Sequence, residues 1–126
     1  MSNPYASHAT KEAKEKLLYT LRGRQGMGRA MKKSELIVIL WGEDAAADKS
    51  YNNKYDRSLR TMIEEINHEG GKVCSGTHGY WWAASLDDGL PAAESLRARA
   101  LTQLENANHL VENIKQVYGG QLGMGL

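Results

Sequence analysis

Residues 54–82 read KYDRSLRTMIEEINHEGGKVCSGTHGYWW, and this stretch decides the fold. Its first half carries apolar side chains at the spacing of one helix face, and two glycines, Gly70 and Gly71, end that pattern. Its second half has two short β-prone runs on either side of a turn over residues 76–79. The stretch therefore predicts an amphipathic helix followed by a β-hairpin.

Two more helices are expected upstream. Residues 10–22 are good helix formers with three leucines on one face. Residues 34–41 form a dense apolar block, which alone fits a buried strand or a short buried helix equally well, and its helical neighbours favour the helix. Residues 43–53 are polar and Ala-rich, which predicts a loop.

A long helix is expected after the hairpin, over residues 90–118. Pro91 suits its first turn, and Gly119-Gly120 ends it. We expect a flexible lead over residues 1–9, one domain over residues 10–86, and a flexible tail over residues 119–126. The predicted class is mainly α with a small β-hairpin (α+β).

Composition sets limits on the class of protein. The chain has 126 residues, 41% apolar and 25% charged, which is ordinary for a globular domain. A single cysteine excludes an internal disulfide, and no apolar run is long enough to span a membrane. The first residues do not resemble a signal peptide, so we expect a cytoplasmic protein without a membrane partner.

The charge is distributed unevenly along the chain. The net charge is +1, but residues 1–35 hold eight Lys or Arg against three Glu, whereas residues 73–126 hold three basic against five acidic residues. Such asymmetry can steer a protein onto nucleic acid in one orientation.

The order of three helices and a hairpin is that of a winged helix domain. Residues 56–66, the Glu69-Gly70-Gly71 that follows them, residues 73–75 and Gly79-Tyr80-Trp81 resemble winged helix-turn-helix proteins of bacteriophages and prophages. The likeness extends to Leu96-Arg97-Ala98-Arg99-Ala100 and covers residues 52–100 well, but residues 11–42 weakly. The segment before the third helix is longer than the usual turn of about three or four residues. The resemblance implies a DNA-binding regulator or replication accessory factor.

The outward face of the expected third helix has side chains suited to nucleic acid. Asn and Arg pair with base edges, and Lys neutralises phosphates. The basic loop before the second helix would follow a phosphate backbone, and the hairpin turn would touch a phosphate or the minor groove. The expected nucleic-acid-binding residues are Arg24, Arg29, Lys32, Lys33, Asn53, Lys54, Arg57, Thr61, Thr77 and His78.

Simpler interpretations of these residues stay open. The helix face is also consistent with a solvated surface on which Asp56 pairs with Arg60. The basic loop is also consistent with a solvated linker, and the hairpin with one that only closes the core. Glu64, Glu65 and Glu69 make the second half of the helix acidic and limit docking to its first half.

Two features suggest contacts with other proteins. Tyr80 and Trp82 are expected to face the core, whereas Trp81 would face outward, where it could stack on a base or dock a partner. The long helix has an apolar seam at heptad spacing, which fits pairing with a second copy or packing on its own domain, and we favour the homodimer. The expected interface residues are Trp81, Ala100, Leu104, Ala107, Val111, Ile114 and Tyr118.

No enzyme, cofactor or metal site is expected. Cys74, His78 and His68 lack a fourth ligand, so burial of the thiol is the better interpretation. The glycines at positions 23, 26 and 28 are not followed by the Lys-Ser/Thr of a nucleotide-binding loop. The alternative function is a protein-binding winged helix module that engages or inhibits a host nucleic-acid enzyme.

Overall fold

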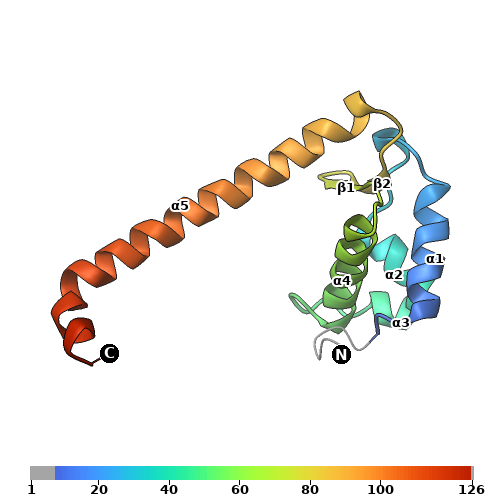
Figure 1. The fold of residues 1–126 in the computed structure, drawn as a ribbon. Coiled ribbons are helices and arrows are strands. Elements are labelled where there is room, and N and C mark those ends of the chain that lie inside the picture. The colour runs from blue at the N-terminus through green and yellow to red at the C-terminus, as the bar shows by residue number, and fades with distance from the viewer. Residues whose placement is uncertain (1–7, 126) are drawn as a thin grey trace. The chain divides into compact units, whose positions relative to one another are not determined.

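A computed structural model describes residues 8–125, and these residues are mainly helical (Figure 1). The chain divides into two units, residues 1–92 and 93–126. The elements in chain order are α1 (Lys11–Arg22), the 3-10 turn η1 (Met27–Arg29), α2 (Lys33–Trp41), α3 (Glu43–Ala46), α4 (Lys54–His68), β1 (Val73–Gly76), β2 (Gly79–Trp82) and α5 (Leu86–Gly125).

The core of the first unit lies between α1, α2 and α4 and one face of the hairpin (Figure 1). Each helix contributes apolar residues to it, and the fully buried ones include Leu17, Leu21, Leu36, Leu59 and Met62. Burying one such side chain stabilises the fold by about 1.5–3 kcal/mol. The amphipathic spacing in the sequence therefore gave the correct inward faces of α1 and α4.

Local signals in the sequence start and stop these helices. Thr10 begins α1 by accepting a hydrogen bond from the Ala13 backbone N–H at 3.1 Å. Glu35 accepts from the Lys32 backbone N–H at 2.9 Å and so closes the first turn of α2. Gly42, with a φ of 97°, ends α2. The apolar block over residues 34–41 is thus helical.

Parts of the expected loop and of the expected flexible lead pack against the rest of the first unit. The expected loop over residues 43–53 contains α3, because Gly42 turns the chain so that Ala45 is buried in the core. Of the expected flexible lead, residues 1–7 lie outside the described residues, but His8 and Ala9 are partly buried. The His8 carbonyl accepts from Trp41 Nε1 at 3.2 Å, and the His8 ring lies 4.8 Å from the Tyr55 ring.

The hairpin pairs Val73 with Trp82 and Gly76 with Gly79 in antiparallel register. The segment before α2 lies beside β2, because Met31 and Tyr80 exchange two backbone hydrogen bonds of 2.8 Å each. The basic loop is therefore anchored to the hairpin and is not a plain solvated linker. At Gly26 and Met31 its backbone N–H groups are bonded to β2 instead of to water.

Trp81 is not on an outward face as the alternation along the strand suggested. It is only 2% exposed, and its Nε1 donates to the Asp88 carboxylate at 3.1 Å. The first turn of α5 covers this face of the hairpin, where Cys74 is also buried. The expectation that Trp81 contacts a partner or a base is therefore wrong, because the chain's own helix occupies that face.

Asp88 joins three segments of the first unit. Besides Trp81, it accepts hydrogen bonds from the Ala84 backbone N–H at 3.0 Å and the Met27 backbone N–H at 2.9 Å. These backbone donors, Ala84 foremost, lower the pKa of the Asp88 carboxyl below its ordinary value. The ionised carboxylate therefore holds η1, β2 and the start of α5 together.

Replacing Asp88 with asparagine is expected to lower the melting temperature at neutral pH. The pKa of the Asp88 carboxyl is lower in the folded chain than in the unfolded chain. The carboxylate therefore stabilises the fold at pH values above the unfolded-state pKa, and this contribution is lost as the pH falls through the folded-state pKa. The difference between wild type and Asp88→Asn should therefore shrink below about pH 3.8, the ordinary carboxyl value. Thermal melts across this range test it, with Asp87→Asn as the exposed control. A difference that does not change with pH contradicts this role.

The bounds of α5 differ from those expected. It begins at Leu86, where Ser85 Oγ accepts from the Asp88 backbone N–H at 3.2 Å, so Pro91 lies inside the helix instead of in its first turn. It also continues past Gly119-Gly120 to Gly125, which corrects the expected tail, although residue 126 lies outside the described residues. Within residues 8–125, no helix combines the length and apolar character needed to cross a membrane.

Candidate nucleic-acid interface

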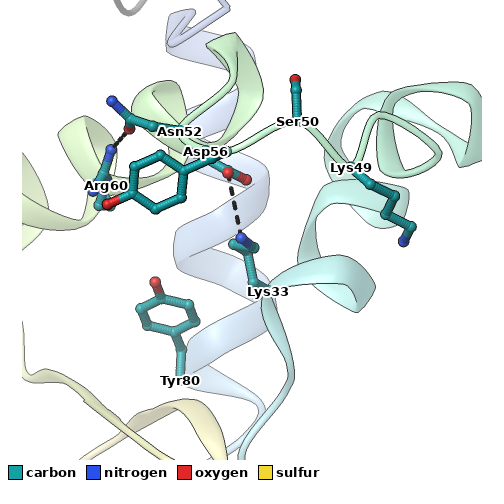
Figure 2. Close-up of a pocket in the computed structure, with 8 residues that line it drawn as sticks. Lys33, Lys49, Ser50, Asn52, Asp56, Arg60 and Tyr80 are labelled. Atoms are coloured by element: carbon teal, nitrogen blue, oxygen red, sulfur yellow. Dashed lines mark hydrogen bonds and ion pairs between the residues drawn. The ribbon is translucent and has the colours of Figure 1, made fainter.

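An open cavity of about 370 Å³ lies in the first unit. Segments far apart in the sequence contribute to it: the start of α2, the loop between α3 and α4, the first turns of α4, and β2 (Figure 2). The residues that line it are Lys33, Lys49, Ser50, Tyr51, Asn52, Asp56, Arg60 and Tyr80. We call this hollow the basic cavity.

Asn53 fixes the loop that forms one wall of the basic cavity. Its side-chain oxygen caps α4 by accepting from the Asp56 backbone N–H at 2.9 Å, and its Nδ2 donates to the Asp48 carbonyl at 2.9 Å. Asp48 in turn accepts from the Ser50 backbone N–H at 3.0 Å, and the Ser50 hydroxyl foremost lowers the pKa of the Asp48 carboxyl. These bonds place Lys49, Ser50 and Tyr51 at the cavity.

Positive charge predominates around the basic cavity. Lys33, Lys49 and Arg60 bring three cations, and Asp56 has the one carboxylate among the described residues that line it. Lys33 Nζ lies 3.3 Å from Asp56 Oδ2 (Figure 2). Arg60 donates to the side-chain oxygen of Asn52. The remaining positive charge faces an open hollow, which suits an anionic ligand.

Besides the cations, the basic cavity has a hydroxyl donor in Tyr80. Burial raises the pKa of the Tyr80 hydroxyl, and Asp56 acts in the same direction against the opposing effect of Arg60. The hydroxyl therefore stays protonated and can donate. Tyr51 is 98% exposed at the rim, where a ring is free to stack. Ammonium, guanidinium and hydroxyl donors around one hollow match the oxygens of a phosphodiester.

The nucleic-acid-binding residues expected from the sequence are only partly brought together. Lys33 lines the basic cavity, and Lys54 and Arg57 lie on the first turns of α4. Asn53 is buried as the cap of α4, so its amide is not available to a base edge. Thr61 is half-buried further along α4, and the others lie exposed on other segments: Arg24, Arg29, Lys32, Thr77 and His78.

Thr61 belongs to a different surface. It lines a hollow of about 330 Å³ with Glu64, Glu65, His68 and Glu69, which is acidic. Lys14 of α1 pairs with two of these acids, at 3.1 Å from Glu65 and 2.7 Å from Glu69. The hydrogen bonds to Glu69 and then Glu65 raise the pKa of Lys14. This acidic hollow would repel a phosphate backbone, so the expectation for Thr61 is not supported by its neighbours.

The comparisons with known proteins add no relative. No protein-family model, no curated protein and no solved structure matches this chain.

Sequence reasoning missed most of the basic cavity. It interpreted Lys49, Ser50 and Tyr51 as part of a plain loop, and it paired Arg60 with Asp56. In the structure Asp56 pairs with Lys33 instead. One available signal was Asn53 as a helix cap, because a capped helix fixes the residues just before it.

The cysteine has the environment of a buried thiol. Its Sγ lies 3.9 Å from the carbonyl oxygen of Gly89, and burial, with a smaller effect of Asp88, raises the pKa of Cys74. Within the described part of the chain, no group of three or more His, Cys, Asp or Glu side chains is arranged to hold a metal ion.

Proposed function

We propose that this protein is a winged helix-turn-helix module that docks on double-stranded DNA through the basic cavity. The observation that carries the proposal is that three cations from separate segments, Lys33, Lys49 and Arg60, are among the residues that line one open hollow. Cations on rigid elements neutralise phosphates and fix the orientation of a duplex. The resemblance to phage winged helix proteins supports a role as a transcriptional regulator or replication accessory factor.

The arrangement of the elements supports the winged helix part of the proposal. Three helices, α1, α2 and α4, precede a hairpin, and Met31 pairs with that hairpin beside β2. In this assignment α4 is the recognition helix and the turn at Thr77 and His78 is the tip of the wing. Lys54 and Arg57 would then extend the contact surface along α4.

The docking proposal predicts binding that weakens steeply with salt. Removing two cavity cations with Lys49→Ala/Arg60→Ala should weaken duplex binding at low salt at least about tenfold, because two phosphate contacts are lost. The negative slope of log K against log salt should also become shallower, by about 0.9 for each lost contact. Fluorescence anisotropy titrations at several salt concentrations measure both quantities. A single strand of the same sequence shows whether a duplex is required.

The matched control removes equal charge elsewhere. Lys11→Ala/Lys16→Ala takes two exposed cations from α1, away from the residues that line the basic cavity. Circular dichroism confirms that both variants fold. The docking proposal fails if wild type does not bind at low salt, or if the control loses as much affinity as the cavity variant.

The protein-binding alternative has less support. Trp81, the residue expected to contact the partner, is buried. The acidic second half of α4 is partly neutralised within the chain, because Glu65 and Glu69 pair with Lys14. We therefore keep nucleic-acid docking as the proposed function of the first unit. We propose no enzymatic activity, cofactor or metal for this chain.

A further inference from the structure

Taken by itself, the second unit is a length of α5 whose apolar face has no partner within that unit among the described residues. Every side chain of α5 from Ala93 to Tyr118 is exposed. They include Leu104 at 56% and Ile114 at 44%. An isolated helix gains most of its stability from packing its apolar face, so a face of this length needs a partner.

The apolar face has three parallel rows of side chains. The central row consists mainly of small residues, and the two rows beside it are mainly large. The rows repeat every seven residues, which is the spacing of a coiled-coil seam. The central row is Ala93, Ala100, Ala107 and Ile114, one flanking row is Leu96, Gln103, Leu110 and Val117, and the other is Arg97, Leu104, Val111 and Tyr118.

We propose that residues 93–118 pair with the same segment of a second copy in an antiparallel coiled coil. In the register that follows, Leu104 lies beside the partner's Ala107, and Ala107 beside the partner's Leu104. This pairing does not depend on nucleic-acid binding, since it involves only the second unit.

Side-chain size favours this register. Antiparallel pairing places a residue of the central row opposite one of the Leu104 row, so a small residue meets a large one in most layers. Ala93 then meets the partner's Tyr118, and Ala100 meets the partner's Val111. Alternating large and small residues fills a helix interface without voids. A parallel pair would instead place Ala100 against the partner's Ala100 and leave the layer underpacked.

Charge favours the same register. At the edge of the seam, Glu94 lies opposite the partner's Lys115, and the symmetry of the pair repeats this contact. Arg97 lies in a layer with the partner's Ile114, beside Glu94 of its own helix. A parallel pair would bring Arg97 against the partner's Arg97 inside the seam, which costs stability, and would leave Glu94 and Lys115 unpaired.

The first test is the oligomeric state of the full chain. Wild type should sediment as a dimer, and Leu104→Glu should sediment as a monomer at the same concentration, because it places a charge in the centre of the seam. Thr102→Glu is the matched control, since position 102 lies on the side of the helix away from the three rows. A monomeric wild type overturns the proposal. The apolar face would then pack on the chain's own first unit or bind another protein.

The second test is the direction of the pair. Glu94→Cys and Lys115→Cys chains are mixed and treated with a short bismaleimide cross-linker. The two positions are about 32 Å apart along one helix, so an antiparallel pair links one variant to the other and neither variant to itself. Self-linked Glu94→Cys chains indicate a parallel pair and overturn the register. The wild-type chain, with its single buried Cys74, is the blank.

Discussion

Replacing Trp81 with alanine is expected to lower the free energy of unfolding by about 3–5 kcal/mol. The indole is 2% exposed between the hairpin and the first turn of α5. Its deletion leaves a cavity and also takes away the 3.1 Å hydrogen bond from Nε1 to Asp88. Both losses act on the same junction, so this substitution should be among the most destabilising in the chain.

Chemical denaturation of Trp81→Ala and of two comparison variants separates the causes. Trp81→Phe keeps a ring but removes the donor, so it should cost less than the alanine variant. Tyr51→Ala removes an aromatic ring that is 98% exposed, and it should leave the midpoint almost unchanged. A Trp81→Ala variant that unfolds at the wild-type denaturant concentration contradicts the burial of this side chain.

A second large loss of stability is expected for Gly79→Ala, of about 2–4 kcal/mol. Gly79 opens β2 with a φ of 111°, in a region that side chains rarely adopt. A Cβ there would lie 2.2 Å from the Met31 carbonyl oxygen. Backbone must move to relieve that overlap, and the movement would separate Met31 from Tyr80, whose paired hydrogen bonds hold the segment before α2 beside the hairpin.

Gly28→Ala is the control for the glycine experiment. A Cβ at Gly28 would meet nothing within 4 Å, so the free energy of unfolding should change by less than about 1 kcal/mol. Urea titrations followed by circular dichroism measure both variants. Equal midpoints for the two would show that Met31 does not pack against Gly79 in solution.

The parts of the fold that could be predicted are those with a strong pattern in their own stretch of sequence. The stripe that runs through Leu59, Met62 and Ile66 gave α4 its inward face, and the glycine-bounded turn gave the hairpin. Residues 34–41 were ambiguous alone because an all-apolar run has no period. The helices expected on either side favoured a helix over a strand, and the structure confirms a helix there.

The errors arose where one element packs on another. Alternation along a strand placed Trp81 outward on the assumption that one face of the hairpin is solvated, but the first turn of α5 covers that face. The loop around Met31 was interpreted as a basic loop on a phosphate backbone or a solvated linker, yet β2 supplies partners for its backbone at Met31. The sequence around Trp81 does not indicate its contact with α5, and the sequence around Met31 does not indicate its pairing with β2.

The candidate site shows the same limit. Lys33 was identified from the local excess of basic residues, whereas Lys49 and Tyr51 were not, because nothing near them in the sequence is unusual. Their place at the basic cavity follows from the hydrogen bonds of Asn53. A site assembled from an irregular loop depends on the folded backbone, and composition alone does not give that.

The position of Asp88 also bears on how the first unit opens. One carboxylate accepts hydrogen bonds from η1, from β2 and from the turn that begins α5. Unwinding that first turn would remove all three bonds together, so we expect the hairpin, η1 and the start of α5 to open as one cooperative unit. A ligand that ordered any of these segments would then protect the other two from local unfolding.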